Sequence, residues 1–382
     1  MELREIEGYD EGDTFWVLNG FTDDWDGIPF SWRASDPDNS VLLEFKWWVE
    51  NYDNPFDIAR SSLAEDSLGG VYAGLDPKDG WVASSNTSIY GIPSGHWRFI
   101  IKVRDDAFYE GAADTFEFYA VHPYFDPSDS VVVWQMYEDE FEHRLLFIHG
   151  NNTTTGFTDE MFQFYNDQFT YFGSNRDYYD VYSETEGIKG QAGYVKLLTT
   201  KWEMKDYSII YLQCVSDNLA AGMFKWPDPD LLEEFREYVE AGGRVIFDGR
   251  DMMRKIAHFA SAYSPYGQIP FDMFGVSWMG SAAGFDSAYA IHPEYQDLDI
   301  DTEQYTFIGN ISAIGVYPYF SGVPFAEVLY CAGYYDDPLS ETNLNGLPIA
   351  CRFAKTTTRT AFFAFPLCAM DNSQGSVTDA MD

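Results

Sequence analysis

Two side chains that could act as a nucleophile and its base stand at the ends of apolar segments. His149 ends the apolar run in RLLFIHG, and Cys214 ends the segment SIIYLQC. If both segments are neighbouring parallel strands, their carboxyl ends lie at one edge of the sheet, where a histidine can lower the pKa of a thiol and activate it. This pair would suit a cysteine hydrolase or peptidase. The alternative interpretation is a cysteine packed in the core and a histidine in a turn.

A second group of reactive side chains follows the segment RVIF. Asp248, Arg250 and Asp251 lie in the turn after this apolar segment, and ligands of open α/β sheets bind where strands end. The turn holds no cysteine or serine. It therefore predicts a ligand-binding turn without a nucleophile.

Two acidic turns have the oxygen-rich composition that calcium prefers. One precedes Gly27, and the other is the alternating segment DLDID. Their aspartates are Asp23, Asp24, Asp26, Asp297, Asp299 and Asp301. Neither turn has the spacing of an EF-hand loop, so a solvated acidic surface is the alternative interpretation. We expect no cofactor, with calcium as the alternative.

The elements that would position the turn at Asp248 follow from the pattern of residues 228–249. Apolar residues recur at helical spacing from Leu231 to Val239, and Gly242 suits a helix end. An apolar strand then follows over residues 244–247. The helix, the glycine stop and the strand together predict an α/β crossover unit.

Strand and helix patterns alternate from residue 144 onward. Strands are expected at 144–149, 178–182, 207–212, 244–247, 326–331, 348–353 and 360–365, and further helices at 159–172, near 194–198 and at 251–263. This succession predicts a doubly wound parallel sheet over residues 144–382. The last residues read as a helix cut short, so we expect the domain to be truncated at its C-terminus.

The first 125 residues carry strand patterns and turn clusters instead of helical ones. Strands are expected at 28–34, 41–49, 97–104 and 115–121, with an acidic, aromatic insertion near 51–80. Their alternation predicts an antiparallel β-sandwich with one solvated side, followed by a linker at 126–143.

Composition limits the partners. The chain of 382 residues has 62 acidic and 23 basic residues, a net charge of −39, and 46% hydrophobic residues. Such a charge disfavours nucleic acid and anionic lipid, and no apolar run of about 18 residues predicts membrane insertion. The four cysteines are too scattered for a disulfide framework, although Cys331 and Cys351 lie on segments that could be neighbours.

Two groups of motifs resemble known families. FSWRASDPDNS and IPSGHWRFIIKVRDDAFYEGAADTFEF resemble fibronectin type III and immunoglobulin-like modules of bacterial surface proteins. FREYVEAGGRVIFDGRD and RTAFFAFPLCAM resemble the class I glutamine-amidotransferase-like, flavodoxin-like domain of secreted bacterial proteins. Catalytic members of that family carry a cysteine after the Gly-Gly strand, where this chain has Asp248. The resemblance therefore implies an immunoglobulin-like sandwich followed by a non-catalytic α/β domain.

These observations favour a non-catalytic structural or adhesive module at the cell surface or outside the cell. Its expected partner is protein, by self-association or within a larger surface assembly, and calcium would stabilise its acidic loops. A hydrolase using His149 and Cys214 is one alternative. A carbohydrate-binding module using exposed tryptophans such as Trp47, Trp48 and Trp81 is another.

Overall fold

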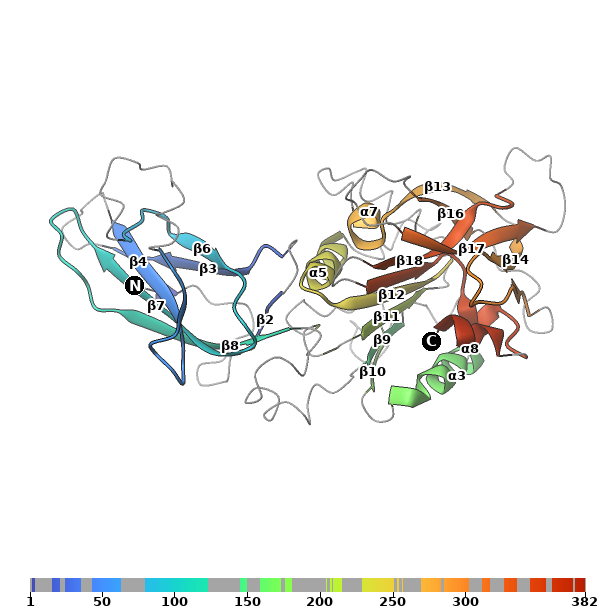
Figure 1. The fold of residues 1–382 in the computed structure, drawn as a ribbon, viewed down its shortest axis with the longest axis horizontal. Helices are drawn as coiled ribbons and strands as arrows, with labels where there is room; N and C mark the ends of the chain where they lie inside the picture. The colour runs from blue at the N-terminus through green and yellow to red at the C-terminus, as the bar shows by residue number, and fades with distance from the viewer. Residues whose placement is uncertain are drawn as a thin grey trace, which may run out of the picture. The chain divides into compact units, whose positions relative to one another are not determined.

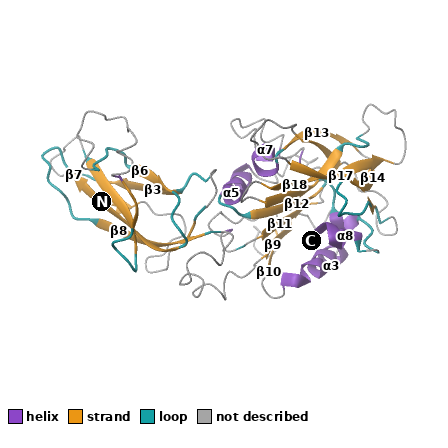
Figure 2. Cartoon of the chain, in the orientation of Figure 1, coloured by secondary structure: helices purple, strands orange, loops and turns teal. Residues whose placement is uncertain are grey.

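The computed structural model divides the chain into two compact units, Met1–Asp139 and Glu140–Asp382. Strands make up most of the regular structure in both units (Figures 1 and 2). The structure describes residues 2–3, 16–20, 25–35, 43–62, 80–122, 145–149, 159–172, 176–180, 204, 207, 209–214, 229–250, 253, 256, 269–282, 285–301, 311–316, 326–334, 344–354, 359–373 and 375–381.

The first unit contains two sheets. A three-stranded sheet has the order β1-β3-β6, and a five-stranded sheet has the order β2-β8-β7-β4-β5. The strands are β1 (Glu2–Leu3), β2 (Trp16–Leu18), β3 (Ile28–Arg33), β4 (Glu44–Asn51), β5 (Ile58–Ser61), β6 (Asn86–Ile89), β7 (Gly95–Arg104) and β8 (Asp114–Val121). All neighbours are antiparallel except β2 and β8, which are parallel. Part of the expected insertion at 51–80 therefore forms β5.

Aromatic rings from the two sheets form the core of the first unit. Residues of β3 alternate between buried and exposed, so that Phe30 and Trp32 point inward. Phe30 stacks on Phe99 of β7 with ring centroids 4.4 Å apart, and Trp32 contacts Phe45 of β4 at 5.7 Å. Alternation of period two thus places one face of each sheet against the other. Trp47 also lies in this core and is 2% exposed.

The second unit is built on a nine-stranded mixed sheet of order β10-β9-β11-β12-β19-β18-β17-β14-β15. The strands are β9 (Leu145–His149), β10 (Arg176–Asp180), β11 (Ile209–Cys214), β12 (Arg244–Gly249), β14 (Phe285–Ala290), β15 (Leu298–Asp299), β17 (Ala326–Tyr334), β18 (Pro348–Ala354) and β19 (Arg359–Phe363). Neighbours from β10 to β19 are parallel, and neighbours from β19 to β15 are antiparallel. A separate antiparallel pair joins β13 (Val276–Ala282) to β16 (Ile311–Val316).

The predicted fold class, an immunoglobulin-like sandwich and then a flavodoxin-like doubly wound parallel sheet, is wrong. The main sheet of the second unit is mixed, because four further strands continue it in antiparallel pairing. Its described helices are short. They are α3 (Asp159–Gln168), α5 (Pro229–Glu240), α7 (Ile269–Phe274), α8 (Ser376–Met381), and the 3₁₀ turns η2 (Phe169–Phe172) and η4 (Leu367–Ala369). Periodicity identified apolar strands but not their pairing partners, which depend on contacts distant in sequence.

Apolar residues of the parallel strands alternate between two clusters. Leu146 and Ile148 join a large cluster with the inner face of α5, whereas Leu145 and Phe147 join a smaller cluster with α3. Figure 1 shows α5 and α7 on one side of this sheet and α3 on the other. Both faces of β9 are therefore covered, which explains why residues 145–148 are all apolar.

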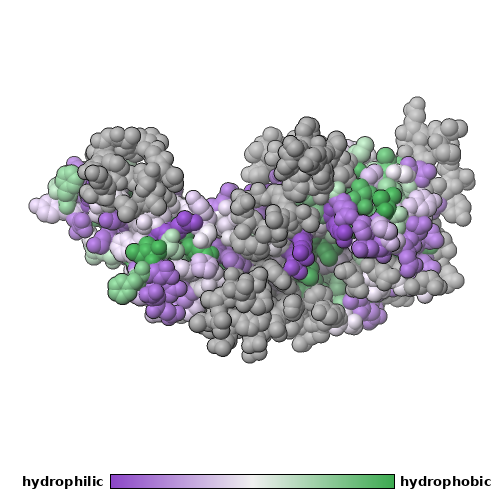
Figure 3. All heavy atoms as spheres, in the orientation of Figure 1, coloured by the Kyte–Doolittle hydropathy of each residue, from purple (hydrophilic) through white to green (hydrophobic). Residues whose placement is uncertain are grey.

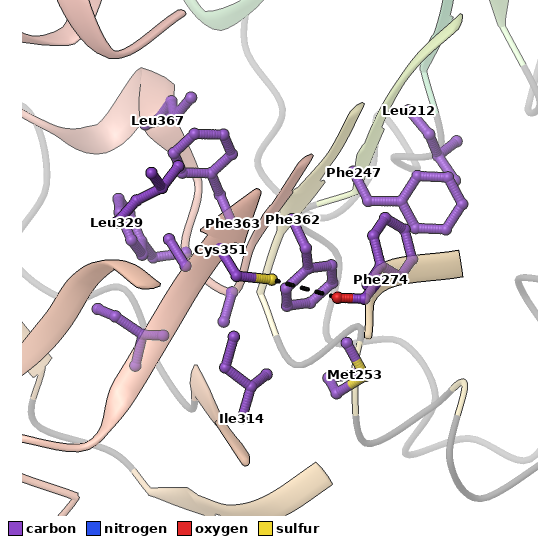
Figure 4. Close-up of a cluster of buried hydrophobic side chains, with 14 of the residues drawn as sticks. Leu212, Phe247, Met253, Phe274, Ile314, Leu329, Cys351, Phe362, Phe363 and Leu367 are labelled. Carbon is purple, nitrogen blue, oxygen red and sulfur yellow. Dashed lines mark hydrogen bonds between the residues drawn. The ribbon is translucent and has the colours of Figure 1, made fainter. Parts of the chain in front are cut away.

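Cys351 and Cys368 belong to the cores of this unit, whereas Cys331 is half-buried, and the three described cysteines form no bridge. Cys331, Cys351 and Cys368 are free thiols. Cys351 lies opposite Val328 and Cys331 lies opposite Pro348, so the two cysteines of β17 and β18 are not cross-strand neighbours. The Cys351 thiol donates to the Phe274 carbonyl at 3.9 Å within the apolar cluster shown in Figure 4.

The corner between α5 and β12 depends on two adjacent glycines. Gly242 has a φ of 109°, the left-handed backbone that stops the helix at low cost. A Cβ on Gly243 would lie 2.1 Å from the ring of Tyr238, which is fully buried and donates its hydroxyl to the Tyr207 carbonyl. The ring cannot move without losing that bond.

We expect Gly243→Ala to lower the free energy of unfolding by about 1–3 kcal/mol, because an added methyl group overpacks the core. Gly280→Ala is the matched control, since its Cβ would meet only the Leu344 side chain at 3.7 Å, an ordinary contact. Urea denaturation measures both variants. Equal stability of the two variants would contradict the packing argument.

Candidate functional site

The most distinctive polar side chain of the second unit is Asp248, at the carboxyl end of β12. It is fully buried. Its Oδ2 accepts hydrogen bonds from the hydroxyl of Tyr165 and, at 2.7 Å, from the hydroxyl of Tyr211, while Oδ1 accepts the Leu367 amide at 3.1 Å. The Tyr165 oxygen in turn accepts the Cys368 amide at 3.3 Å. One carboxylate therefore links four separate segments of the chain.

Local structure explains how these groups meet. Tyr165 lies on the inner face of α3, and Tyr211 lies on β11 opposite Ile246 of β12. Because side chains alternate along a strand, Ile246 and Asp248 share one face with Tyr211. The rings of Tyr165 and Tyr211 are 5.6 Å apart and are both fully buried or nearly so. The apolar packing of α3 therefore presents both hydroxyls to the carboxylate.

Burial governs the protonation of the cluster. Burial raises the pKa of Asp248 to about 7, although the hydrogen bonds from Tyr165, Tyr211 and Leu367 act to lower it. Burial also raises the pKa of both tyrosines well above the usual value, and the Asp248 charge adds to this effect. Both phenols keep their protons at neutral pH and remain donors. Protein donors therefore surround the Asp248 carboxyl group, and the side chain is not exposed to solvent.

Cys368 lies beside this carboxyl group. It is 6% exposed, and its pKa is raised by burial and then by the Asp248 charge. Burial likewise raises the pKa of Cys351. Neither thiol supplies a thiolate at neutral pH, which is the form that nucleophilic catalysis needs.

We expect native protein at pH 7 to leave Cys351 and Cys368 unmodified by Ellman's reagent, while urea-unfolded protein reacts at every cysteine. Mass spectrometry of the labelled peptides identifies the sites. Cys331 is half-buried and serves as the internal control with intermediate reactivity. Rapid native labelling of Cys368 would show that the Asp248 cluster opens to solvent, against the burial observed.

The predicted pair of His149 and Cys214 lies at the ends of neighbouring strands. His149 pairs with Gln213 across β9 and β11, and Cys214 pairs with Gly249 across β11 and β12. Cys214 is therefore one residue beyond the position opposite His149. Consecutive strand residues alternate between faces, so the pairing assigns the two positions to opposite faces of the sheet. The structure does not describe the side chains of His149 and Cys214, so the dyad stays a prediction.

The remaining predicted residues do not form one site among the described parts of the chain. Arg250 follows β12 directly and is half-buried, while Asp251 lies outside the described residues. Asp297 accepts the Ala290 amide at 2.8 Å, Asp299 belongs to β15, and the Asp301 amide donates to the Ala369 carbonyl at 3.0 Å.

The predicted calcium ligands do not gather in the part of the chain that the structure describes. No group of three or more His, Cys, Asp or Glu side chains there is arranged to hold a metal ion. Asp26, Asp297 and Asp299 are exposed, and Asp23 and Asp24 lie outside the described residues. Calcium binding by these acidic loops therefore stays a prediction.

Sequence reasoning selected Asp248 but missed its partners. The helix expected at 159–172 contains Tyr165 and the strand expected at 207–212 contains Tyr211, but the patterns indicate no role for either hydroxyl. A signal was available, because a carboxylate ending an apolar strand must find donors when buried. Tyrosines on apolar faces can supply such donors.

Comparisons with known proteins place the chain in no family. No protein family model matches the sequence, and no curated protein matches it. One solved structure, the exo-beta-1,4-mannosidase Op5Man5 from Opitutaceae bacterium strain TAV5, aligns at 11% identity with a TM-score of 0.34, over 63% of this chain. The aligned part is 36% of that enzyme's length, and a TM-score this low supports no inference about this chain.

The family resemblances read from the motifs are therefore corrected. Neither the fibronectin type III or immunoglobulin-like assignment nor the amidotransferase-like one is matched by a family model. The mixed sheet also contradicts the flavodoxin-like domain that the second assignment implied. Motifs such as a Gly-Gly helix end before an apolar strand record a local corner, which unrelated folds share.

Proposed function

We propose that this protein is a non-catalytic structural or adhesive module that binds other protein, either a second copy or a component of a larger assembly. The observation that carries the proposal is the state of Asp248. The strand end where ligand chemistry was expected holds a buried carboxyl group whose oxygens accept three protein donors. Such a group stabilises the fold and does not reach a substrate.

Exposed hydrophobic side chains in the first unit support binding. The large ones there are Tyr52, Phe56, Ile58, Tyr90, Phe108 and Tyr109. On the face drawn in Figure 3, hydrophobic residues lie between hydrophilic ones among the described residues. Exposed aromatic residues are enriched where proteins contact partners. Glycan is the alternative partner, although buried Trp47 is not available to stack on a sugar ring.

The proposal includes a location at the cell surface or outside the cell. A net charge of −39 is best tolerated where salt or divalent cations screen it, and calcium is the cation that acidic loops bind most readily outside cells. Among the described residues no helix is long and apolar enough to span a membrane.

Light scattering tests the self-association part of the proposal. The chain is measured first with EDTA and then with millimolar calcium, at fixed protein concentration. We expect the mass to increase when calcium is added, because neutralised carboxylates no longer repel one another. Magnesium at the same concentration is the matched control for ionic strength. A monomer under every condition would contradict self-association.

A further inference from the structure

We propose that the loop between β7 and β8, residues 105–113, docks into a protein partner that presents an apolar pocket rimmed by lysine and arginine side chains. The inference rests on the proposed function and specifies its partner. Phe108 is 71% exposed and Tyr109 is 77% exposed at the tip of this loop. Two adjacent aromatic side chains thus remain in water where an ordinary loop would carry polar residues.

The backbone of Phe108 is held in an unfavourable conformation. Its φ is 64°, and it is the one described residue other than glycine with a positive φ. A bulky side chain disfavours this region, and such strain recurs at binding sites. The Phe108 side chain is mostly exposed, so its burial within this unit contributes little free energy to offset the backbone strain.

Hydrogen bonds hold the loop in this shape. The Asp105 carboxylate accepts the Tyr109 amide at 2.8 Å, and the Phe108 amide donates to the Asp105 carbonyl at 3.1 Å. The Asp105 amide donates to the Tyr109 carbonyl at 3.3 Å. The aromatic tip is therefore ordered before any partner arrives, which lowers the entropy lost on binding.

The Arg104 side chain, at the end of β7, also contacts the loop tip. The Arg104 guanidinium lies 4.6 Å from the ring centroid of Trp81 and 5.1 Å from that of Phe108. Its Nε donates to Glu44 at 2.6 Å, so the guanidinium is fixed. Of the two rings that Arg104 contacts, Trp81 is half-buried and Phe108 is mostly exposed.

Charge specifies the partner. The segment DDAFYEGAAD, residues 105–114, contains four acidic residues and no lysine or arginine. Asp106 and Glu110 flank the aromatic pair and are exposed. The Lys102 Nζ lies 3.7 Å from the Glu110 Oε2, so these two side chains form an ion pair. A second copy of this chain also carries −39, so repulsion disfavours it at this loop. An apolar pocket would take the aromatic side chains, and a basic rim around it would complement the acidic residues.

A peptide selection tests the inference. Random linear peptides displayed on phage are selected on the whole chain, and the affinity of the enriched peptides is then measured on the whole chain and on the double variant Phe108→Ala, Tyr109→Ala. We expect the surviving peptides to combine aromatic or aliphatic residues with lysine and arginine. Their affinity should fall at least about tenfold for the double variant. The matched control Phe56→Ala removes a side chain that is 96% exposed on the β4–β5 turn, and should leave affinity unchanged.

Two further variants separate binding from folding. Phe108→Gly relieves the positive φ, so we expect an equal or higher melting temperature together with the same loss of peptide affinity. Asp106→Asn with Glu110→Gln should slow association and reduce its dependence on salt. Peptides without basic residues, equal binding to Phe108→Ala, Tyr109→Ala, or a selection that yields no loop-dependent peptide would each overturn the proposal. A calcium-indifferent monomer in light scattering would contradict self-association alone and leave these results unaffected.

Discussion

Replacing Asp248 with alanine is expected to lower the free energy of unfolding by about 3–5 kcal/mol. The substitution removes the acceptor for Tyr165, Tyr211 and the Leu367 amide at once. All three donors lie in the core, where water does not replace the lost acceptor. An unsatisfied buried donor costs about 1–3 kcal/mol, and the three losses are not fully additive because the donors share one acceptor.

Variants of the partner residues apportion this loss. Tyr211→Phe removes one hydroxyl donor, and we expect it to cost about 1 kcal/mol. Tyr165→Phe should cost more, because the Tyr165 oxygen also accepts the Cys368 amide and that amide would lose its acceptor. Asp299→Ala makes the same chemical change on an exposed residue and should shift stability by less than about 0.5 kcal/mol.

Urea denaturation followed by circular dichroism measures these variants. The proposed linking role of Asp248 would be wrong if Asp248→Ala cost no more than Asp299→Ala. An ordering in which Tyr211→Phe cost more than Tyr165→Phe would contradict the second acceptor role of Tyr165. Enzymatic assays play no part in this test, so it remains informative even if the chain has an activity elsewhere.

The second large effect is a dependence of stability on pH that Asp248 controls. Its pKa is raised from 3.8 to about 7 in the folded chain, chiefly by burial. The folded state therefore binds a proton that the unfolded state has already lost between these two values. The stability linked to this proton is fully present below pH 3.8 and is lost as pH rises through about 7.

Comparison with Asp248→Asn isolates this dependence, because asparagine does not titrate. From pH 5 to 7 we expect the wild type to lose stability relative to the variant by at most about 1.4 kcal/mol per pH unit, the limit for one proton. Above pH 8 the difference should be constant. The difference between the two proteins cancels the contribution of the other carboxylates. A difference that rises with pH would contradict a protonated Asp248.

These two effects bear on how a buried carboxyl group persists in the chain. A structural acceptor must compensate its desolvation with hydrogen bonds, and Asp248 has three. Removing one partner is costly, whereas an apolar cluster of similar volume can be equally stable. The carboxyl group therefore connects α3, β11, β12 and η4 at defined positions, which favours one arrangement of these segments over others.

Individual elements were predictable where the pattern is local. The helix before Gly242 corresponds to α5, and residues 159–172 correspond to α3 followed by η2. The expected strands around residues 145, 210 and 245 correspond to β9, β11 and β12. Apolar spacing of period two or near four determines such elements, since it reflects which face one segment buries. The helices expected near 194–198 and at 251–263 lie wholly or mostly outside the described residues.

Strand order and the partners of Asp248 required the tertiary structure. The composition of an apolar segment suits parallel and antiparallel pairing equally well. The sequence therefore gives no signal that the four strands beyond β19 pair in antiparallel orientation.

The sequence by itself determined the net charge of −39 and the corner between α5 and β12 that ends at Asp248. Only the tertiary structure decided what surrounds that residue. Its donors lie 37, 83 and 119 residues away along the chain, and such separations carry no periodicity. They meet because apolar faces of α3 and the sheet pack together, and packing of distant segments is a property of the whole fold.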